Sequence, residues 1–196
     1  MLLPLVAAGA AAARLAPVLA PVPLVLGAGI ALFFRDPERA VTPRPDAALS
    51  PADGRVLRVS VEPDEYWQQD MTEVAIFLGL QDVHVQRIPL AGQVVAQRRK
   101  AGGYKPAMTE AATHGNNQLA TYLRTEVGPC TVTQISGLVA RRIVTWAGVG
   151  DQVAQGDRLG MIKFGSQVTL RLPTSARVRV AAGDRVTGGI TVIAEF

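Results

Sequence analysis

The sequence predicts an all-β fold, a β-barrel or β-sandwich, preceded by an apolar N-terminal segment. Three observations predict it. Residues 1–34 carry a single charge, that of Arg14. After Pro43 the chain changes to short runs rich in Val and Ile, separated by Gly, Pro, Asp and Asn, which is the pattern of strands joined by turns. No long run of apolar residues at helical spacing competes with these strands. We therefore divide the chain into a hydrophobic segment, residues 1–36, and a β domain, residues 37–196.

The hydrophobic segment is long enough to enter a membrane. Residues 15–34 contain no charge, and 20 residues is the length of a helix that crosses a bilayer. Three prolines interrupt the first half of this stretch, so a hairpin in one leaflet or a short helix from Leu24 onward are alternatives. A cleavable signal peptide would end at a small-residue site, which the sequence before Arg35 lacks. We expect a retained anchor at the cell membrane, with Arg35 and Arg39 favouring a cytoplasmic domain.

The β domain contains a series of candidate strands with intervening turn residues. They are residues 55–61, 73–78, 83–88, 93–98, 118–124, 131–135, 141–145, 160–163, 168–172, 177–180 and 190–195. Two further segments, 63–71 and 105–113, are candidates for short helices.

A seven-residue pattern, G-D-x-V-x-x-G, occurs at residues 150–156 and again at 183–189. Its glycines suit tight turns with positive φ, and its aspartates can cap a turn through their side chains. Such turns recur in biotinyl- and lipoyl-type β-sandwiches, to which we expect the fold to be related. Two similar but unrelated β-turns are the simpler interpretation.

Composition excludes several kinds of site. The single cysteine, Cys130, excludes an intramolecular disulfide and the multi-cysteine metal patterns. With only His84 and His114, a multi-histidine metal site is disfavoured, and we predict no metal. The net charge is +4 and aromatic residues make up 5% of the chain, without a basic run that interleaves them. An anionic membrane is therefore favoured over nucleic acid as a partner.

Four short segments combine into a more specific signal. They are F-F-R-D-P at 33–37, S-P-A-D-G at 50–54, D-V-H-V-Q-R-I-P at 82–89 and K-F-G-S at 163–166. Each one alone is a common sequence, but the ordered set is specific. With it, nearly the whole chain resembles the short form of the phosphatidylserine decarboxylase family.

The resemblance implies an enzyme that makes its own cofactor. Members of the family cut themselves between a glycine and a serine, here Gly165 and Ser166, and Ser166 becomes a pyruvoyl group. The products are a large chain, residues 1–165, and a small chain, residues 166–196, which stay associated. The mature enzyme is implied to convert a serine phospholipid, phosphatidylserine, to phosphatidylethanolamine, with the pyruvoyl carbonyl as electron sink.

The residue types suit this chemistry. Gly165 leaves its carbonyl open to attack by the Ser166 hydroxyl, which would give an ester, then a dehydroalanine-type end, and then the pyruvoyl group. Both the attack and the α-proton removal need a base near neutral pKa, for which His84 is the candidate. His84 is also our candidate for the donor that protonates the product carbon, with water as the alternative. Asp53 could orient His84 as in a Ser-His-Asp constellation, or serve only as a turn residue.

The sequence departs from the longer family members at two places. They have a second histidine three positions after the first, linked to self-cleavage, where this chain has Arg87; short members commonly lack it. His84 would then serve cleavage, decarboxylation or both. The family also has an N-E pair near the centre, whereas this chain has N-N-Q at residues 116–118, with Asn117 in place of the glutamate.

Other polar residues have simpler interpretations. His114 is interpreted as a polar loop residue, and Cys130 as a small buried hydrophobe. The Arg141-Arg142 pair could meet a lipid phosphate or be a solvated strand end.

Two alternative functions remain open from the sequence. A biotinyl- or lipoyl-type carrier would be modified at Lys163, but lacks the usual residues flanking that lysine and would not explain Asp53 or His84. A non-catalytic, membrane-anchored β scaffold is the other alternative. Preference for acyl or ether lipids, and the oligomeric state, homo-oligomers included, stay open.

Overall fold

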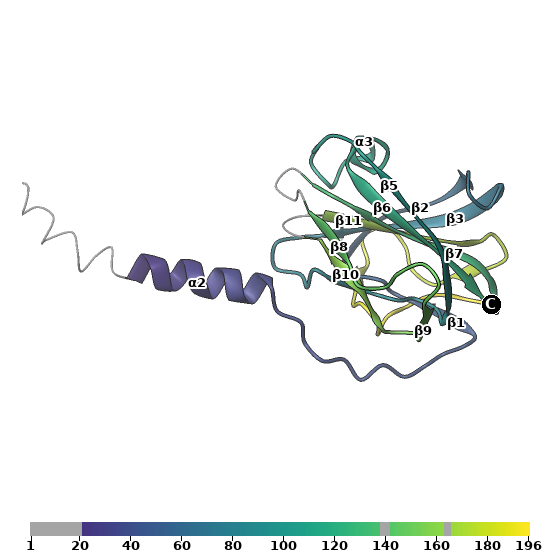
Figure 1. Ribbon diagram of the computed structural model, residues 1–196, viewed down its shortest axis with the longest axis horizontal. Helices are drawn as coiled ribbons and strands as arrows, with labels where there is room; N and C mark the ends of the chain where they lie inside the picture. Colours follow the sequence, from purple (N-terminus) through teal and green to yellow (C-terminus); the bar gives the residue numbers. More distant parts are fainter. Residues whose placement is uncertain (1–20, 138–141, 163–165) are drawn as a thin grey trace, which may run out of the picture. The chain divides into compact units, whose positions relative to one another are not determined.

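The structure is a computed structural model that describes residues 21–137, 142–162 and 166–196. The chain divides into two compact units, Met1–Arg35 and Asp36–Phe196. In the first unit, helix α2 spans Pro21–Phe33 and contains no charged residue (Figure 1). Among the described residues, no helix has both the length and the apolar character needed to cross a membrane. Association of this segment with a membrane therefore stays a prediction.

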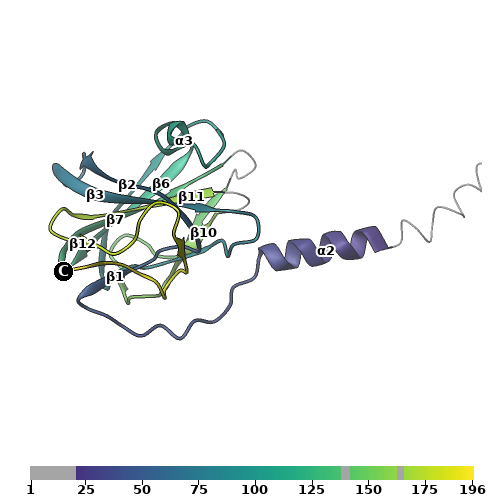
Figure 2. The ribbon, with the colours of Figure 1, turned by 180° about the vertical axis from the view of Figure 1, so that it is seen from behind.

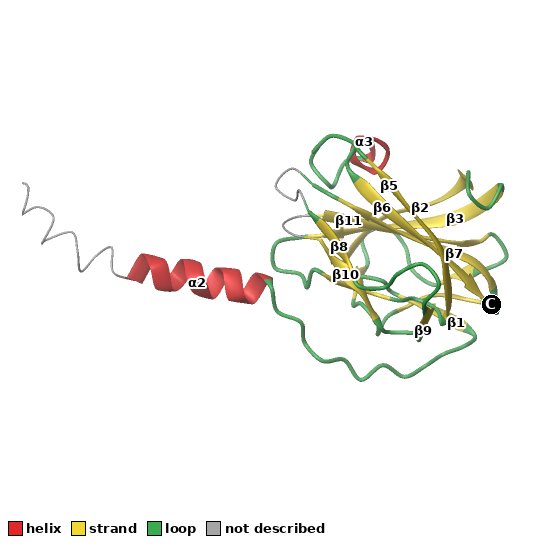
Figure 3. Cartoon of the chain, viewed as in Figure 1, coloured by secondary structure: helices red, strands yellow, loops and turns green. Residues whose placement is uncertain are grey.

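The regular secondary structure of the second unit is almost entirely β, as predicted (Figure 3). In chain order they are β1 Ala47–Leu49, β2 Gly54–Asp64, β3 Gln69–Leu78, β4 Val85–Arg87, β5 Gly92–Lys100, β6 Gln118–Thr125, β7 Gly128–Ile135, β8 Ile143–Thr145, β9 Gln152–Val153, β10 Arg158–Ile162, β11 Ser166–Pro173, β12 Arg177–Val178, β13 Arg185–Val186 and β14 Val192–Glu195. A short helix, α3, spans Glu110–Gly115.

The strands form one large and two small antiparallel sheets. The large sheet has the order β13-β2-β3-β11-β7-β6-β5-β9, and the small sheets have the orders β1-β14-β12 and β4-β10-β8. Figures 1 and 2 show the large sheet curling over the smaller ones. Alternating side chains of all three sheets enter one core, for example Ile76 and Val168 from the large sheet and Leu159 and Ile193 from the small ones.

Some of the predicted elements differ from the structure. Residues 63–71 are not a helix, because Asp64 ends β2 and its Oδ1 accepts hydrogen bonds from the backbone of Tyr66 and Trp67, which closes a hairpin turn. Of the predicted helix 105–113, only the last part falls in α3. Strands β1, β9 and β13 were not predicted, since two or three residues are too few to show alternation.

Both copies of the G-D-x-V-x-x-G pattern form the predicted turns. Gly150 and Gly183 have φ of 97° and 99°. Asp151 accepts a hydrogen bond from the backbone of Gly148 at 2.7 Å, and Asp184 accepts one from Ala181 at 2.8 Å. The prediction that the aspartates cap their turns is therefore confirmed.

These two turns make the same contacts at opposite edges of the large sheet. The Gly150 amide donates to Val94 O at 2.8 Å, and the Gly183 amide donates to Val56 O at 2.8 Å. In return the amide of Val94 donates to the backbone carbonyl oxygen of Asp151, and the amide of Val56 donates to that of Asp184, each at 2.9 Å. The similarity of the turns is therefore more than local.

The equivalence extends to two complete halves of the domain. One half consists of β1–β3 and β11–β14, and the other of β4–β10. The two halves meet where β11 pairs with β7. A second repeat, P-x-x-G-x-V at residues 51–56 and 89–94, starts β2 and β5 and was missed in the sequence. Across the two halves, Leu49 N donates to Pro89 O at 3.0 Å and Arg87 N donates to Pro51 O at 2.8 Å.

Candidate active site

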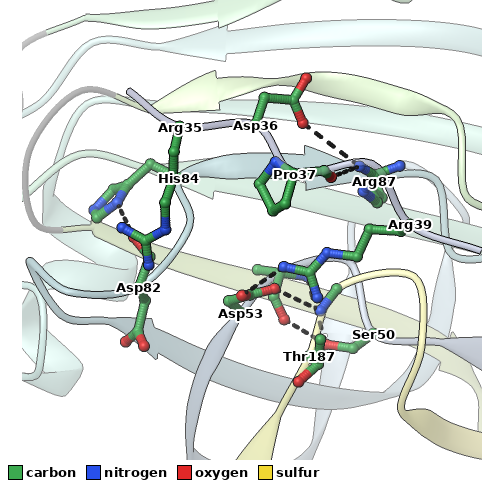
Figure 4. A network of polar contacts seen from close by, with 12 residues as sticks. Arg35, Asp36, Pro37, Arg39, Ser50, Asp53, Asp82, His84, Arg87 and Thr187 are labelled. Carbon is green, nitrogen blue, oxygen red and sulfur yellow. Dashed lines mark hydrogen bonds and ion pairs between the residues drawn. The ribbon is translucent and has the colours of Figure 1, made fainter. Parts of the chain in front are cut away.

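Hydrogen bonds join three of the four sequence segments in the folded domain, through Pro37, Pro51 and Arg87. Arg87 N donates to Pro51 O, and the Arg87 side chain donates to Pro37 O at 3.1 Å (Figure 4). The backbone of Ile162, which leads into the fourth segment, donates to His84 O at 3.3 Å. Lys163, Phe164 and Gly165 lie outside the described residues, so the predicted cleavage bond is described only on its Ser166 side.

Ser166 is the first residue of β11 and is fully buried. It pairs with Leu78, the last residue of β3. Strand alternation puts its side chain on the same face as Val168, which is the core face. Among the described residues its Oγ has no hydrogen-bond partner. A buried hydroxyl without a partner is costly and often marks a functional position.

His84 is also fully buried. Its Nδ1 lies 2.9 Å from Asp82 O (Figure 4). Because a carbonyl oxygen can only accept, Nδ1 carries the proton of this hydrogen bond. In the neutral ring the lone pair is then on Nε2, which is the nitrogen that can act as a base.

Asp53 has partners other than the one hypothesised from the sequence. Its Oδ2 forms an ion pair with Arg39 at 2.8 Å, and its Oδ1 accepts the backbone N–H of Gly188 at 2.8 Å (Figure 4). These contacts join the segment before β1 to the turn before β14. The observed bond at His84 Nδ1 is to Asp82 rather than Asp53, and an influence of Asp53 on His84 stays a prediction.

Arg87 stands where the longer family members have the second histidine, and its contacts link segments of the chain that are far apart in sequence. The side chain is nearly buried and donates to Gly156 O at 3.0 Å, as well as to Pro37 O and, at 3.5 Å, Asp36. Burial lowers the pKa of Arg87. Asp36 is held a second time by Arg158, at 2.5 Å. A guanidinium is a poor proton acceptor, so Arg87 does not replace a catalytic histidine.

The other residues singled out in the sequence either contact the backbone, are exposed, or pack in the core. Asn116 is buried and exchanges two hydrogen bonds with the Lys105 backbone, both at 2.8 Å. Asn117 O accepts the side-chain and backbone donors of Ser136, each at 2.9 Å. His114 is exposed, as expected of a polar residue, but it lies in helix α3 and not in a loop. Cys130 is buried in the core, which raises the pKa of its thiol, and the prediction of a small buried hydrophobe is confirmed.

Two glutamines near His84 were missed. Gln86 Nε2 donates to His84 O at 2.8 Å, and Gln134 Nε2 donates to Gln86 Oε1 at 2.8 Å; both side chains are fully buried. The signal in the sequence was a polar residue on the core-facing side of a predicted strand: Gln134 alternates with Val132 and Cys130.

The described residues form no cluster of metal ligands, and a large cavity lies away from the predicted site residues. In the described part of the chain, no three His, Cys, Asp or Glu side chains gather as metal ligands. A cavity of about 750 Å³ is lined by residues that include Leu90, Thr125, Val127 and Gln155, and by none of the predicted site residues.

Comparisons with known proteins agree with the four segments. The family model described as phosphatidylserine decarboxylase matches residues 26–194. The phosphatidylserine decarboxylase proenzyme of Saccharopolyspora erythraea is 44% identical over 177 residues, covering 88% of this chain and 75% of the relative. That of Streptomyces coelicolor is 42% identical over 168 residues, 86% of this chain and 73% of the relative. That of Aromatoleum aromaticum is 39% identical over 165 residues, 84% and 77% of the two chains.

Proposed function

The chain belongs to the phosphatidylserine decarboxylase family and is a decarboxylase, and from this we propose that it acts on phosphatidylserine with a pyruvoyl group made from Ser166. The product is phosphatidylethanolamine. The relatives' names contain the word proenzyme, which agrees with a precursor that is processed into two chains. Cleavage between Gly165 and Ser166 would give chains 1–165 and 166–196.

The observation that carries the proposal is the position of the Ser166 hydroxyl. It is buried at the start of β11 and has no hydrogen-bond partner in the described part of the domain. A serine kept for packing would be expected to satisfy its hydroxyl. The residue also fits the group it would become: the Ser166 oxygen would leave with the Gly165 carboxylate and Cβ would become a methyl group, so loss of this hydroxyl sacrifices no hydrogen bond to the described residues. When formed, that carbonyl supplies an electron sink for the departure of carbon dioxide.

Self-cleavage would proceed by an acyl shift followed by elimination. The Ser166 Oγ attacks the Gly165 carbonyl carbon, the peptide C–N bond breaks, and an ester joins the two residues. Removal of the Ser166 α-proton then expels the Gly165 carboxylate and leaves a dehydroalanine. Addition of water to its imine tautomer releases ammonia and leaves the pyruvoyl group, so no external oxidant is needed.

His84 is the residue to which we assign proton transfer. Its carbonyl oxygen binds Ile162 N, and Ile162 is joined to Ser166 through only three residues of sequence. Nδ1 donates to Asp82 O, which fixes the ring and leaves Nε2 as the basic nitrogen. The buried ring would accept a proton during cleavage and return one to the α carbon after carbon dioxide has left.

The anchor and the membrane location belong to the same proposal. The charge-free stretch of residues 15–34 would keep the enzyme at the cell membrane, where a phospholipid substrate is concentrated. The catalytic domain would lie on the cytoplasmic side. The small chain would stay bound after the cut, since β11 pairs with both β3 and β7 over most of its length. Its departure would expose sheet edges and core surface.

One combined experiment tests the proposal. The full chain is purified in detergent, its intact mass is measured before and after hydroxylamine treatment, and carbon dioxide release is followed on carboxyl-labelled phosphatidylserine in mixed micelles. We expect two chains, a hydroxylamine adduct on the small chain, and labelled carbon dioxide.

The other outcomes identify what is wrong. One unmodified, uncut chain would favour a non-catalytic scaffold, and a single chain modified at Lys163 would favour a carrier domain. If the protein is cut and bears a carbonyl but releases no carbon dioxide, the pyruvoyl assignment is kept and phosphatidylserine is rejected as the substrate.

A further inference from the structure

The two halves of the β domain differ most informatively at the glutamines beside His84. By strand pairing, Gln134 of β7 is equivalent to Leu172 of β11, because their partners Leu119 and Thr72 occupy the same place in β6 and β3. Gln86 of β4 is likewise equivalent to Ala48 of β1. Leu172 and Ala48 are fully buried members of the core.

The fold therefore does not require polar residues at these two positions. One half fills them with a leucine and an alanine, and the other with two amides that must bury their polar groups. Burying amides costs free energy unless they are hydrogen-bonded. Gln134 Oε1 does not recover this cost from any described residue, since it has no partner there. The pair therefore points to a functional reason for these two amides.

The amides form a bridge between two sheets. Gln134 belongs to the large sheet and Gln86 to the small sheet that contains β4 and β10. The bridge continues from Gln134 Nε2 to Gln86 Oε1, and from Gln86 Nε2 to His84 O, each step at 2.8 Å. Gly160 leaves room for it, because a Cβ there would lie 3.0 Å from Gln134 Nε2.

The two ends of the bridge lie beside the two groups of the proposed chemistry. At one end is the backbone of His84. At the other, Gln134 pairs with Val168, and the alternation of β11 places the Ser166 side chain on the same face of the sheet. The bridge therefore ties β4, the strand that directly follows the histidine, to β7, which pairs with the Ser166 strand β11.

We propose that Gln134 and Gln86 are positioning residues that keep His84 in register with residue 166, above all after self-cleavage. The inference rests on the proposed function, because cleavage at Gly165–Ser166 is what removes the covalent connection between β10 and β11. From then on, the register of the two sheets at the site depends on non-covalent contacts, and this bridge is a polar connection from the large sheet to the backbone of His84.

The test replaces the bridge by the residues of the other half. Gln86→Ala and Gln134→Leu are made singly and together in the full chain. Gln97→Val is the matched control: Gln97 Nε2 lies within hydrogen-bond distance of Thr121, Thr145 and Ala147, and its equivalent in the other half is Val59. Thermal unfolding, the extent of cleavage, kcat, KM, and the ¹⁵N shifts of the two histidines are measured.

We expect the double variant to fold and to be cut, with kcat lowered about tenfold or more and KM within about twofold, because misplacement of a catalytic group acts on the chemical step. The single variants should each lose nearly as much as the double, since the two amides act as one unit. The His84 ring signals should shift, while those of exposed His114 serve as an internal reference. Gln97→Val should leave kcat and the His84 signals unchanged.

An unchanged kcat and unchanged His84 signals in the double variant would overturn the inference. So would additive losses in the singles, or an equal loss in Gln97→Val. If the wild-type chain is neither cut nor active, the proposed function fails, but the His84 signals still decide whether the bridge positions the ring.

Discussion

Two ends of the β domain are built from the same strand pairings and differ in a few side chains. At the first end, Ile162 N donates to His84 O at 3.3 Å, and Ser166 pairs with Leu78. At the equivalent end, Phe196 N donates to Asp46 O at 2.9 Å. There Gly128 pairs with Thr125, as Ser166 pairs with Leu78. We refer to them as the site end and the equivalent end.

The difference lies in burial and polarity rather than in the backbone. His84 is fully buried, whereas Asp46 is exposed and pairs with Arg44 at 2.9 Å. Ser166 contributes a buried hydroxyl where Gly128 has no side chain. The comparison teaches that this fold supplies a scaffold at both ends, and that the proposed chemistry depends on side chains present at one of them.

The largest effect that would sharpen this comparison is expected at Ser166. Ser166→Ala removes the hydroxyl and should give one uncut chain without carbonyl reactivity or decarboxylation, as measured by intact mass. Thr169→Ala, on the same strand and also buried, is the control and should be cut normally. Cleavage of Ser166→Ala at the same bond would show that Ser166 is not the nucleophile.

His84 should have the next largest effect. His84→Ala removes the proposed base and should slow cleavage, decarboxylation or both by about a hundredfold or more, the usual contribution of a general acid–base residue. Asp46→Ala changes the equivalent position, and His114→Ala the other histidine; both should stay close to wild type. Near-normal rates in all three variants would remove the distinction between the two ends.

Asp53 should have a smaller effect, and its partner Arg39 makes it possible to say why. Asp53→Asn and Arg39→Gln both break the same partly buried ion pair. We expect each to slow cleavage by about threefold, because the segments that this ion pair holds beside the site would move. Single-turnover cleavage during refolding would measure it. If only Asp53→Asn is slow, the carboxylate acts on His84 directly.

The smallest effect should come from the equivalent end. Hydrogen bonding and attraction from Arg179, with a further contribution from Arg44, hold the pKa of Glu195 below its ordinary value of 4.5. A lowered carboxyl pKa stabilises the fold above that ordinary value and loses this contribution as pH falls through the lowered pKa. Wild type should therefore have a slightly higher Tm than Glu195→Gln at pH 7, and the difference should narrow in acid.

Decarboxylation should be unaffected by Glu195→Gln at pH 7. A Tm difference that is the same at pH 7 and pH 3 would show that packing, not the ion pair, causes it. A loss of activity in this variant would show that the two ends are coupled.

The sequence by itself determined most of the strands and singled out the candidate site residues. Alternation and turn residues are local, so strands such as β3 and β11, and the turns at Gly150 and Gly183, could be recognised without knowing their neighbours. The four ordered segments likewise singled out Ser166 and His84, and comparison with relatives confirmed the family they indicate.

Tertiary structure decided how those local elements pair. That Asp53 binds Arg39, that Arg87 braces the segment after Arg35, and that Gln134 reaches Gln86 all depend on residues brought together from distant parts of the chain. Such contacts follow from sheet order and packing, which alternation does not encode. The equivalence of the two halves was hidden for the same reason: it is kept in the strand pairings, while the sequences share little beyond their turn glycines, prolines and valines.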